Sequence, residues 1–170
     1  MATLIGLCGK KQSGKSTVAR QLEESLDFIE ISWADPLKNI VGMDLLGLTH
    51  DQVYGEKGKE KVDPFWKKTP RELLQKIGTE CFRKQIDVDF WVKIGSRDIQ
   101  KALDVDQDVV VSDCRFPNEV QTIQDMGGYV FRVVKIGQVS TDTHESETAL
   151  DDMEVDGEIV DRDWETSSAF

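Results

Sequence analysis

The chain has 170 residues, of which 39% are hydrophobic and 31% are charged, and its formal net charge at pH 7 is −11. This length and composition predict one globular domain with a sizeable core. No apolar stretch has the length of a transmembrane helix, so no membrane partner is expected, and the acidity argues against nucleic acid, whose phosphates must be neutralised by basic side chains.

The first predicted element is a strand over residues 4–8, which leads directly into a glycine-rich segment. Residues 9–16 read G-K-K-Q-S-G-K-S, the complete G-x-x-x-x-G-K-[ST] pattern of a phosphate-binding P-loop. Glycines let the backbone point its N–H groups at phosphate oxygens, while Lys15 would reach the β- and γ-phosphates and the Ser16 hydroxyl would hold Mg²⁺. The residues expected to bind the nucleoside triphosphate are Gly9, Lys10, Lys11, Gln12, Ser13, Gly14, Lys15, Ser16 and Thr17.

A helix is predicted directly after the loop, because Val18, Leu22 and Leu26 recur every four residues. Its N-terminus would add a partial positive charge to the phosphate site. Residues 28–31 predict a second strand, followed by a helix from Pro36 to about residue 46.

The helix at Pro36 is expected to have Asp35 as its N-cap. Residues 47–68, which are polar and contain several glycines and lysines, predict a mobile segment. Residues 69–72 read T-P-R-E, a capping box with proline at the first helical position, and they open a helix that continues to about Cys81.

The remaining elements alternate between helix and strand. A helix over 91–103 precedes the β-branched run 109–111, which predicts a strand buried on both faces, with Asp113 at its carboxyl end. A short helix over 119–126 is followed by a strand over 129–134.

Residues 135–148 then predict a loop, and 158–160 a last strand. The alternation predicts an α/β fold with a doubly wound, mostly parallel five-stranded sheet flanked by helices. Ligands in such sheets bind at the carboxyl ends of the strands, where the P-loop and Asp113 are both expected.

Charge and cysteine usage add two expectations. Residues 138–170 hold eleven acidic residues and one basic residue, which we interpret as a solvated surface. Residues 56–84 hold nine basic and five acidic residues, which could attract an anionic substrate. The three cysteines have no metal-binding spacing, and together with the absence of a predicted signal peptide they indicate reduced thiols and a cytoplasmic location.

The chemistry beyond the P-loop depends on residues 113–115, which read D-C-R. Asp113 is typical of a Walker B acid that holds Mg²⁺ directly or through a water, although an aspartate here could also cap the next turn. GTPase signatures are absent, and Cys114 stands where many ATPases have a catalytic glutamate. Arg115 would place positive charge on the transferring phosphoryl group, as in the D-G-x-R turns of nucleoside monophosphate kinases.

Several segments occur in order at compatible spacing: S-W-A-D-P-L-K at 32–38, T-P-R-E-L-L-Q at 69–75, G-T-E at 78–80, D-C-R-F-P-N-E at 113–119 and H-E-S-E at 144–147. Together they resemble the bacteriophage deoxynucleoside monophosphate kinases, a branch of the P-loop kinases, over residues 4–150. The resemblance implies one P-loop kinase domain over 1–170, with a mobile acceptor-binding segment at about 33–85 and a short lid at about 135–148.

The resemblance further implies transfer of the ATP γ-phosphoryl group to a deoxynucleoside 5′-monophosphate, with Mg²⁺, in the host cytoplasm if the protein is phage-encoded. Lys15, Asp113 and Arg115 would be catalytic, with Ser16 and Asp113 as the metal ligands. The residues expected to bind the acceptor are Trp33, Asp35, Lys38, Arg71, Gln75 and Arg115: Lys38 and Arg71 near its phosphate, Trp33 and Gln75 along its base or sugar.

Four of these acceptor residues also have an ordinary structural interpretation: Lys38 and Arg71 as surface charges, Trp33 and Gln75 as core packing. The predicted lid contains no arginine, so the transition-state charge is expected from Lys15, Arg115 and Mg²⁺, with Arg132 or Lys135 as further candidates.

Two other functions remain open at this point. The protein could be a P-loop kinase for another small acceptor, such as dephospho-coenzyme A or a sugar acid. It could also be a nucleotide-gated interaction module that binds ATP without transferring phosphate, with the acidic end as its partner surface. The sequence indicates neither the base preference nor a choice between monomer and homodimer.

Overall fold

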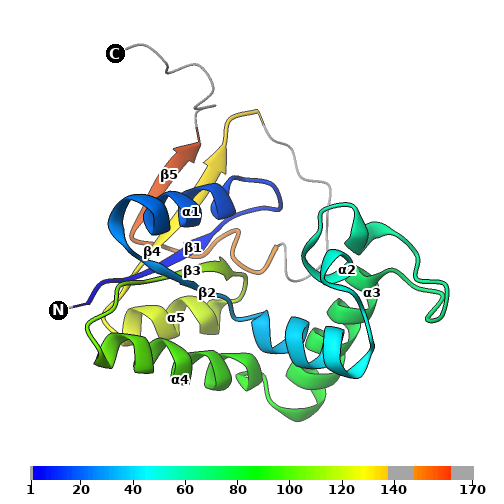
Figure 1. Ribbon diagram of the computed structural model, residues 1–170. Helices are drawn as coiled ribbons and strands as arrows, with labels where there is room; N and C mark the ends of the chain where they lie inside the picture. Colours follow the sequence, from blue (N-terminus) through cyan, green and yellow to red (C-terminus); the bar gives the residue numbers. More distant parts are fainter. Residues whose placement is uncertain (1, 138–147, 162–170) are drawn as a thin grey trace. The chain divides into compact units, whose positions relative to one another are not determined.

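The computed structural model describes residues 2–137 and 148–161 of the chain (Figure 1). Its internal contacts divide the chain into two compact units. We call residues 1–32 with 96–170 the sheet unit, and residues 33–95 the helical unit. The predicted acceptor-binding segment, 33–85, falls inside the helical unit, while a single domain over 1–170 stays a prediction.

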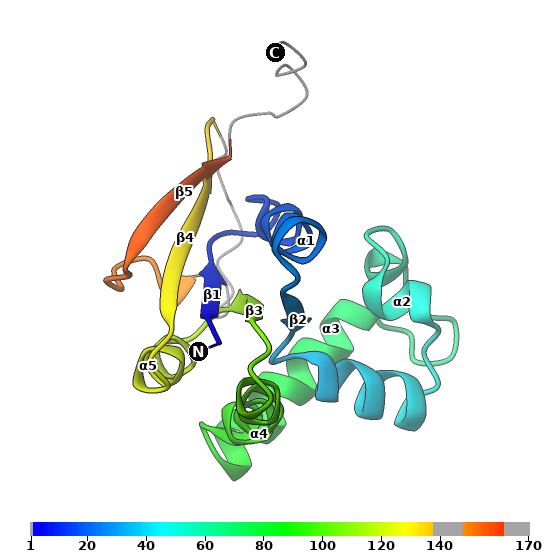
Figure 2. The ribbon, with the colours of Figure 1, turned by 60° about the vertical axis from the view of Figure 1, so that its left-hand side comes forward.

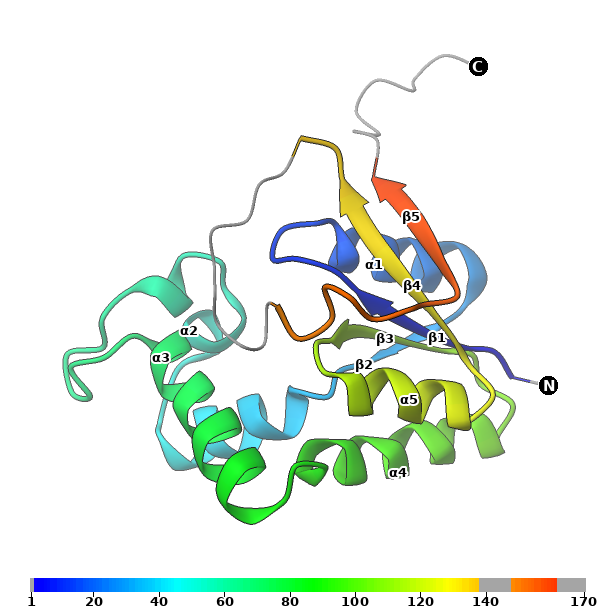
Figure 3. The ribbon, with the colours of Figure 1, turned by 180° about the vertical axis from the view of Figure 1, so that it is seen from behind.

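The described part of the sheet unit contains five strands whose neighbours all pair in parallel, in the order β2-β3-β1-β4-β5 (Figures 1 and 3). Their bounds are β1 Leu4–Cys8, β2 Ile29–Ile31, β3 Val109–Cys114, β4 Tyr129–Lys135 and β5 Gly157–Asp161. The predicted α/β fold with a parallel five-stranded sheet is therefore confirmed.

Helices cover both faces of this sheet. Helix α1 (Lys15–Leu26) follows β1 and lies on one face, and α5 (Pro117–Asp125) lies on the opposite face, which makes the sheet doubly wound (Figure 2). Between these layers the β-branched run Val109–Val111 is completely buried, because a central parallel strand is covered on both sides. The core beside α1 is formed by Leu7, Ala19, Phe28, Val110 and Val133.

The helical unit consists of short helices: η1 (Leu37–Leu45), α2 (His50–Tyr54), η2 (Gly58–Glu60), α3 (Pro70–Gln75), η3 (Lys76–Ile86) and the first part of α4 (Phe90–Asp104). Helices η1 and η3 have the wider π-helical winding; the Leu46 N–H, for example, donates to the carbonyl of Val41, five residues earlier, at 2.9 Å. Gly78 brings two of these helices close together: a Cβ there would lie 2.5 Å from a methyl carbon of Leu37, whose side chain would have to move.

Local signals predicted the start of α3 correctly and the start of the helix near Asp35 incorrectly. The capping box at Thr69 is present: the Thr69 hydroxyl accepts from the Glu72 N–H and the Glu72 carboxylate accepts from the Thr69 N–H. Asp35 as an N-cap is wrong, because the Lys38 N–H already bonds the Ala34 carbonyl at 2.8 Å and Asp35 lies within the first turn.

The stretch predicted as mobile, residues 47–68, contains α2 and η2, and α2 has a capping box of its own at Thr49. Its mobility stays a prediction. Most of the predicted lid, including His144 and Ser146, lies outside the described residues. Within the described residues, no helix combines the length and the hydropathy that a membrane span requires.

Candidate functional site

The predicted P-loop is a loop between strand β1 and helix α1, as the sequence pattern requires. Gly9 and Gly14 have φ angles of 135° and 101°, which L-residues rarely adopt. Gly9 also packs against strand β4, where a Cβ would lie 2.4 Å from the carbonyl oxygen of Val133. These two glycines let the loop bend back over the end of the sheet and place its backbone beside β4.

Lys15 is folded onto the loop that precedes it. Its Nζ donates to the carbonyl oxygens of Gly9 at 2.7 Å and Lys10 at 2.8 Å. The first turn of α1 contains no acidic residue that would offset the positive end of the helix dipole. The ammonium group and the helix N-terminus therefore create a site for an anion at this loop.

Ser13 contributes a hydroxyl to the inner side of the loop. The residue is 2% exposed, and its Oγ has no hydrogen-bond partner among the described residues. A buried hydroxyl without a partner costs free energy, and a phosphate oxygen at the loop would be a suitable acceptor. Its position supports the prediction that Ser13 belongs to the phosphate site.

Asp113 is fixed by a contact from the neighbouring strand. Strands β2 and β3 pair Ile31 with Val111, so the residues that follow them lie side by side. The Ser32 hydroxyl donates to Oδ2 of Asp113 at 2.6 Å, a short hydrogen bond of the charge-assisted type. This contact orients the half-buried carboxylate at the carboxyl end of the sheet, beside the P-loop strand.

Arg115 follows on a turn that a buried carboxylate holds in place. Glu119 is 4% exposed, and its Oε2 accepts from the backbone N–H groups of Arg115 at 2.6 Å and Phe116 at 3.0 Å. Glu119 therefore positions Arg115 through the backbone, besides lying in the first turn of α5. Arg115 lines a cavity of about 170 Å³ together with Gly9, Lys10, Ser13, Arg132 and Lys135.

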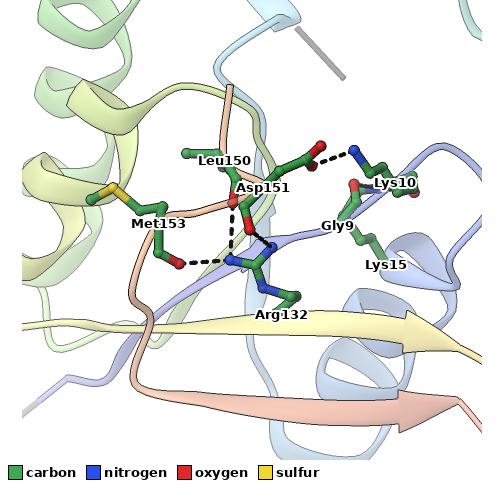
Figure 4. Close-up of polar contacts among 7 residues, drawn as sticks. All are labelled: Gly9, Lys10, Lys15, Arg132, Leu150, Asp151 and Met153. Atoms are coloured by element: carbon green, nitrogen blue, oxygen red, sulfur yellow. Dashed lines mark hydrogen bonds and ion pairs between the residues drawn. The ribbon is translucent and has the colours of Figure 1, made fainter. Parts of the chain in front are cut away.

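One wall of this cavity is the chain segment that precedes β5 (Figure 4). The Arg132 guanidinium donates to the carbonyl oxygens of Met153 at 2.6 Å, Leu150 at 2.9 Å and Asp151 at 3.5 Å. The carboxylate of Asp151 forms an ion pair with Lys10 of the P-loop. Arg132, a candidate for transition-state charge, is thus engaged in holding residues 150–153, which in turn place an acid against the phosphate loop.

The cations near Cys8 act on its thiol. Burial raises the pKa of Cys8, which the nearby charges of Arg132 and Lys15 lower in part. Cys8 and Cys114 are both buried at the end of the sheet, and Cys81 is exposed. The buried pair is therefore part of the core beneath the P-loop.

In the helical unit, Lys38 lies in a group of polar side chains. Its Nζ is 4.8 Å from the centre of the Tyr54 ring and 3.9 Å from Oδ1 of Asp35. Arg71, in the first turn of α3, is also paired: its Nε lies 2.7 Å from Oε1 of Glu60. The structure thus places Asp35 beside Lys38 and gives each predicted acceptor cation a polar neighbour.

Trp33 and Gln75 occupy different environments. Trp33 is 2% exposed, and its ring packs so closely on Gly95 that a Cβ there would lie 2.5 Å from a ring carbon, which favours the packing role. Gln75 is half-buried at the end of α3. Contact of either residue with an acceptor stays a prediction.

The sequence patterns did not identify Ser32, Tyr54, Glu60 or Asp151. Ser32 stands in the S-W-A-D-P-L-K segment, so its neighbourhood carried a signal. The other three lie in segments without a recognisable motif, and their contacts with Lys38, Arg71 and Lys10 bridge 11 to 141 residues of sequence. No local pattern predicts such pairs.

The family model and the curated relatives that match this chain carry the same description. Residues 59–164 match the model of the family described as deoxynucleotide monophosphate kinase. The chain is 39% identical over 163 residues to a protein of Acanthamoeba polyphaga mimivirus assigned as a deoxynucleotide monophosphate kinase, covering 86% of this chain and 81% of that protein. It is 36% identical over 81 residues to the deoxynucleotide monophosphate kinase of Escherichia phage RB69, covering 47% of this chain and 33% of that enzyme.

Among solved structures, dephospho-CoA kinase from Campylobacter jejuni aligns with a TM-score of 0.47 and 17% identity, covering 95% of this chain and 89% of that one. The family match extends over more than half of the chain, and the mimivirus relative aligns along most of both sequences. The chain therefore belongs to the deoxynucleotide monophosphate kinase family, and it is a phosphotransferase.

Proposed function

We propose that this kinase transfers the γ-phosphoryl group of ATP to a deoxynucleoside 5′-monophosphate, producing ADP and the deoxynucleoside diphosphate. The observation that carries the proposal is the P-loop itself: Lys15 folded on its carbonyls, an uncompensated helix N-terminus, and Arg115 on the wall of the adjoining cavity. This arrangement concentrates positive charge where triphosphate would bind.

The donor phosphates are assigned to the sheet unit. Lys15 would exchange its bonds to the Gly9 and Lys10 carbonyls for bonds to the β- and γ-phosphates. Arg115, on the turn held by Glu119, would contact the equatorial oxygens of the γ-phosphoryl group as charge develops on them. An acceptor phosphate oxygen then attacks the γ-phosphorus, and the bond to the β,γ-bridging oxygen breaks.

Mg²⁺ fits the oxygen donors that the chain offers. Mg²⁺ usually takes one or two protein oxygens, with waters and phosphate oxygens completing its octahedron. The Ser16 hydroxyl, in the first turn of α1, and the Asp113 carboxylate, oriented by Ser32, are such donors. The ion, when bound, neutralises charge on the β- and γ-phosphates.

The acceptor phosphate is assigned to Lys38 and Arg71 in the helical unit. Arg71 lies in the first turn of α3, where its charge adds to the positive end of the helix. Arg71→Ala should raise the KM for the monophosphate about tenfold, the loss of one charge-assisted phosphate contact, and leave the KM for ATP unchanged. Arg20→Ala is the matched control, because the Arg20 side chain is 66% exposed on α1.

The experiment is a coupled ADP-release assay with the common deoxy- and ribonucleoside monophosphates, dephospho-coenzyme A and a sugar acid as acceptors. We expect ADP release to depend on a deoxynucleoside monophosphate. Release that depends on another acceptor, or ATP binding without any transfer, would overturn the proposal. A rise in the KM for ATP without a rise in the KM for the monophosphate in the Arg71 variant would show that the acceptor has been placed on the wrong residues.

A further inference from the structure

Residues 50–60, which include α2 and η2, contact both cations assigned to the acceptor phosphate. The Tyr54 ring lies 4.8 Å from Nζ of Lys38, and the Glu60 carboxylate lies 2.7 Å from Nε of Arg71. The stretch comes from the segment that the sequence marks only as polar and glycine-containing. Helices α2 and α3 lie beside each other in this unit (Figures 1 and 2).

The Tyr54 ring is held on two sides. Its hydroxyl lies 2.7 Å from Oδ1 of Asn39 and 3.2 Å from Oδ1 of Asp35, and donates to one of them at a time. The His50 ring stacks on it with centroids 4.8 Å apart. A ring held in this way offers a fixed face to the Lys38 ammonium, which lies within the range of a cation–π interaction. Lys38, a flexible side chain by nature, is thereby held in one region.

Glu60 contacts Arg71 at the edge of the guanidinium that a phosphate would not need. The guanidinium is a planar fork, and Glu60 bonds its Nε edge. The terminal edge, with both Nη nitrogens, is then the edge that would meet a phosphate in a bidentate contact. The Arg71 side chain is 19% exposed and that of Glu60 is 46% exposed, so the contact holds a mostly buried guanidinium from its solvent side.

We infer that Tyr54 and Glu60 are positioning residues for the acceptor phosphate. They order the side chains of Lys38 and Arg71 before the monophosphate binds, and in this way they raise the affinity for it. The inference rests on the proposed function of these two cations. Long cationic side chains lose rotamer freedom when they bind a ligand, and side chains that are already ordered lose less. Tyr54 and Glu60 should therefore affect the affinity for the acceptor and leave the chemical step unchanged.

The experiment measures kcat and both KM values for four variants. Tyr54→Leu and Glu60→Ala should each raise the KM for the monophosphate about three- to tenfold, with kcat and the KM for ATP within about twofold of the parent. Tyr54→Phe should raise this KM less than Tyr54→Leu does, because it keeps the ring over Lys38 and loses only the hydrogen bond of the hydroxyl to Asn39 or Asp35. Glu60→Gln should be intermediate, because its amide oxygen still accepts from Nε.

The matched controls are Tyr129→Leu and Glu56→Gln. Tyr129 is an exposed residue of β4, and Glu56 is an exposed acid of the same stretch that pairs with Lys59. Both should leave the KM for the monophosphate unchanged, and thermal unfolding identifies any variant whose fold is weakened. Tyr54→Phe and Glu60→Gln keep the test valid if a larger change prevents folding.

Glu60→Ala distinguishes two roles of Glu60: ordering Arg71 for the phosphate, or competing with the phosphate for Arg71. If Glu60 only competed with the phosphate for Arg71, its removal would lower the KM for the monophosphate, and that result would overturn the inference. The inference also fails if Lys38→Met and Arg71→Ala raise this KM while the Tyr54 and Glu60 variants do not, a result that leaves the proposed function intact. If the two cation variants themselves have no effect, the proposed acceptor site is wrong.

Discussion

The ion pair between Asp151 and Lys10 places a negative charge at the edge of the proposed triphosphate site, and Asp151→Asn tests what that charge does. The substitution keeps the shape of the side chain and the backbone carbonyl that accepts from Arg132. It removes one acid from a cavity wall that otherwise carries Lys10, Arg115, Arg132 and Lys135. The Asp151 carboxylate competes with phosphate oxygens for Lys10, so its loss should favour the nucleotide.

The size of the effect follows from the exposure of the pair. The side chains of Lys10 and Asp151 are 34% and 46% exposed, and ion pairs of this kind contribute about 0–1 kcal/mol. Removing the competing acid should therefore tighten binding by up to about fivefold. The gain should shrink in 0.5 M salt, since exposed charges are then screened within about 4 Å.

The assay is calorimetric titration of the parent and the variant with ADP and with inorganic tripolyphosphate, at low and at high salt. Asp152→Asn is the control, because it changes the net charge equally at an exposed neighbouring position. Equal affinities for the Asp151 and Asp152 variants would refute the reasoning. Weaker binding of ADP by Asp151→Asn would show that the acid supports the nucleotide and does not compete with it.

Three further predictions concern catalysis and acid stability. Lys15→Met should lower kcat at least ~100-fold, because in the proposed reaction the ammonium leaves the Gly9 and Lys10 carbonyls for the β- and γ-phosphates, while thermal unfolding should show that the fold is retained. Arg115→Ala should lower kcat and kcat/KM together by ~10²–10⁴-fold in steady-state assays, and Arg115→Lys should not restore most of this, since an ammonium lacks the planar fork. The pKa of Glu72 is lowered by two hydrogen bonds from Thr69: chiefly the bond from its backbone N–H, and to a smaller extent the bond from its hydroxyl. A carboxyl group whose pKa is lower in the folded than in the unfolded protein stabilises the fold at any pH above its unfolded pKa. This stabilisation is lost as the pH falls through the pKa of the folded protein. Denaturation of Glu72→Gln should therefore show a deficit at pH 7 that disappears in acid.

The fold and the backbone geometry of the P-loop could be predicted because both depend on local chemistry. The P-loop needs glycines at positions with positive φ, and β3 needs a continuous β-branched run, so each is visible within a few residues. The capping box at Thr69 is local for the same reason. Asp35 shows the limit of such signals, because it lies within the first helical turn and its carboxylate contacts Lys38 and Tyr54 instead of capping the helix.

The sequence could not predict the partners of the cations that we propose to act on phosphate. The sequence makes Arg132 a candidate for transition-state charge, whereas its hydrogen bonds to three carbonyls depend on the path of the chain before β5. The pairing of Lys10 with Asp151 joins residues 141 positions apart. Such contacts are selected by tertiary packing, which no periodicity or motif encodes.

The helical unit is one uninterrupted stretch of chain, because the sheet unit consists of the residues before 33 and the residues after 95. The contacts that order Lys38 and Arg71 are all made within that stretch. The chain therefore enters and leaves this unit once each. We expect that replacing residues 33–95 with the matching segment of a relative would transfer that relative's acceptor preference, while the core of the sheet unit stays unchanged. Such an exchange offers a route to kinases with new base selectivity.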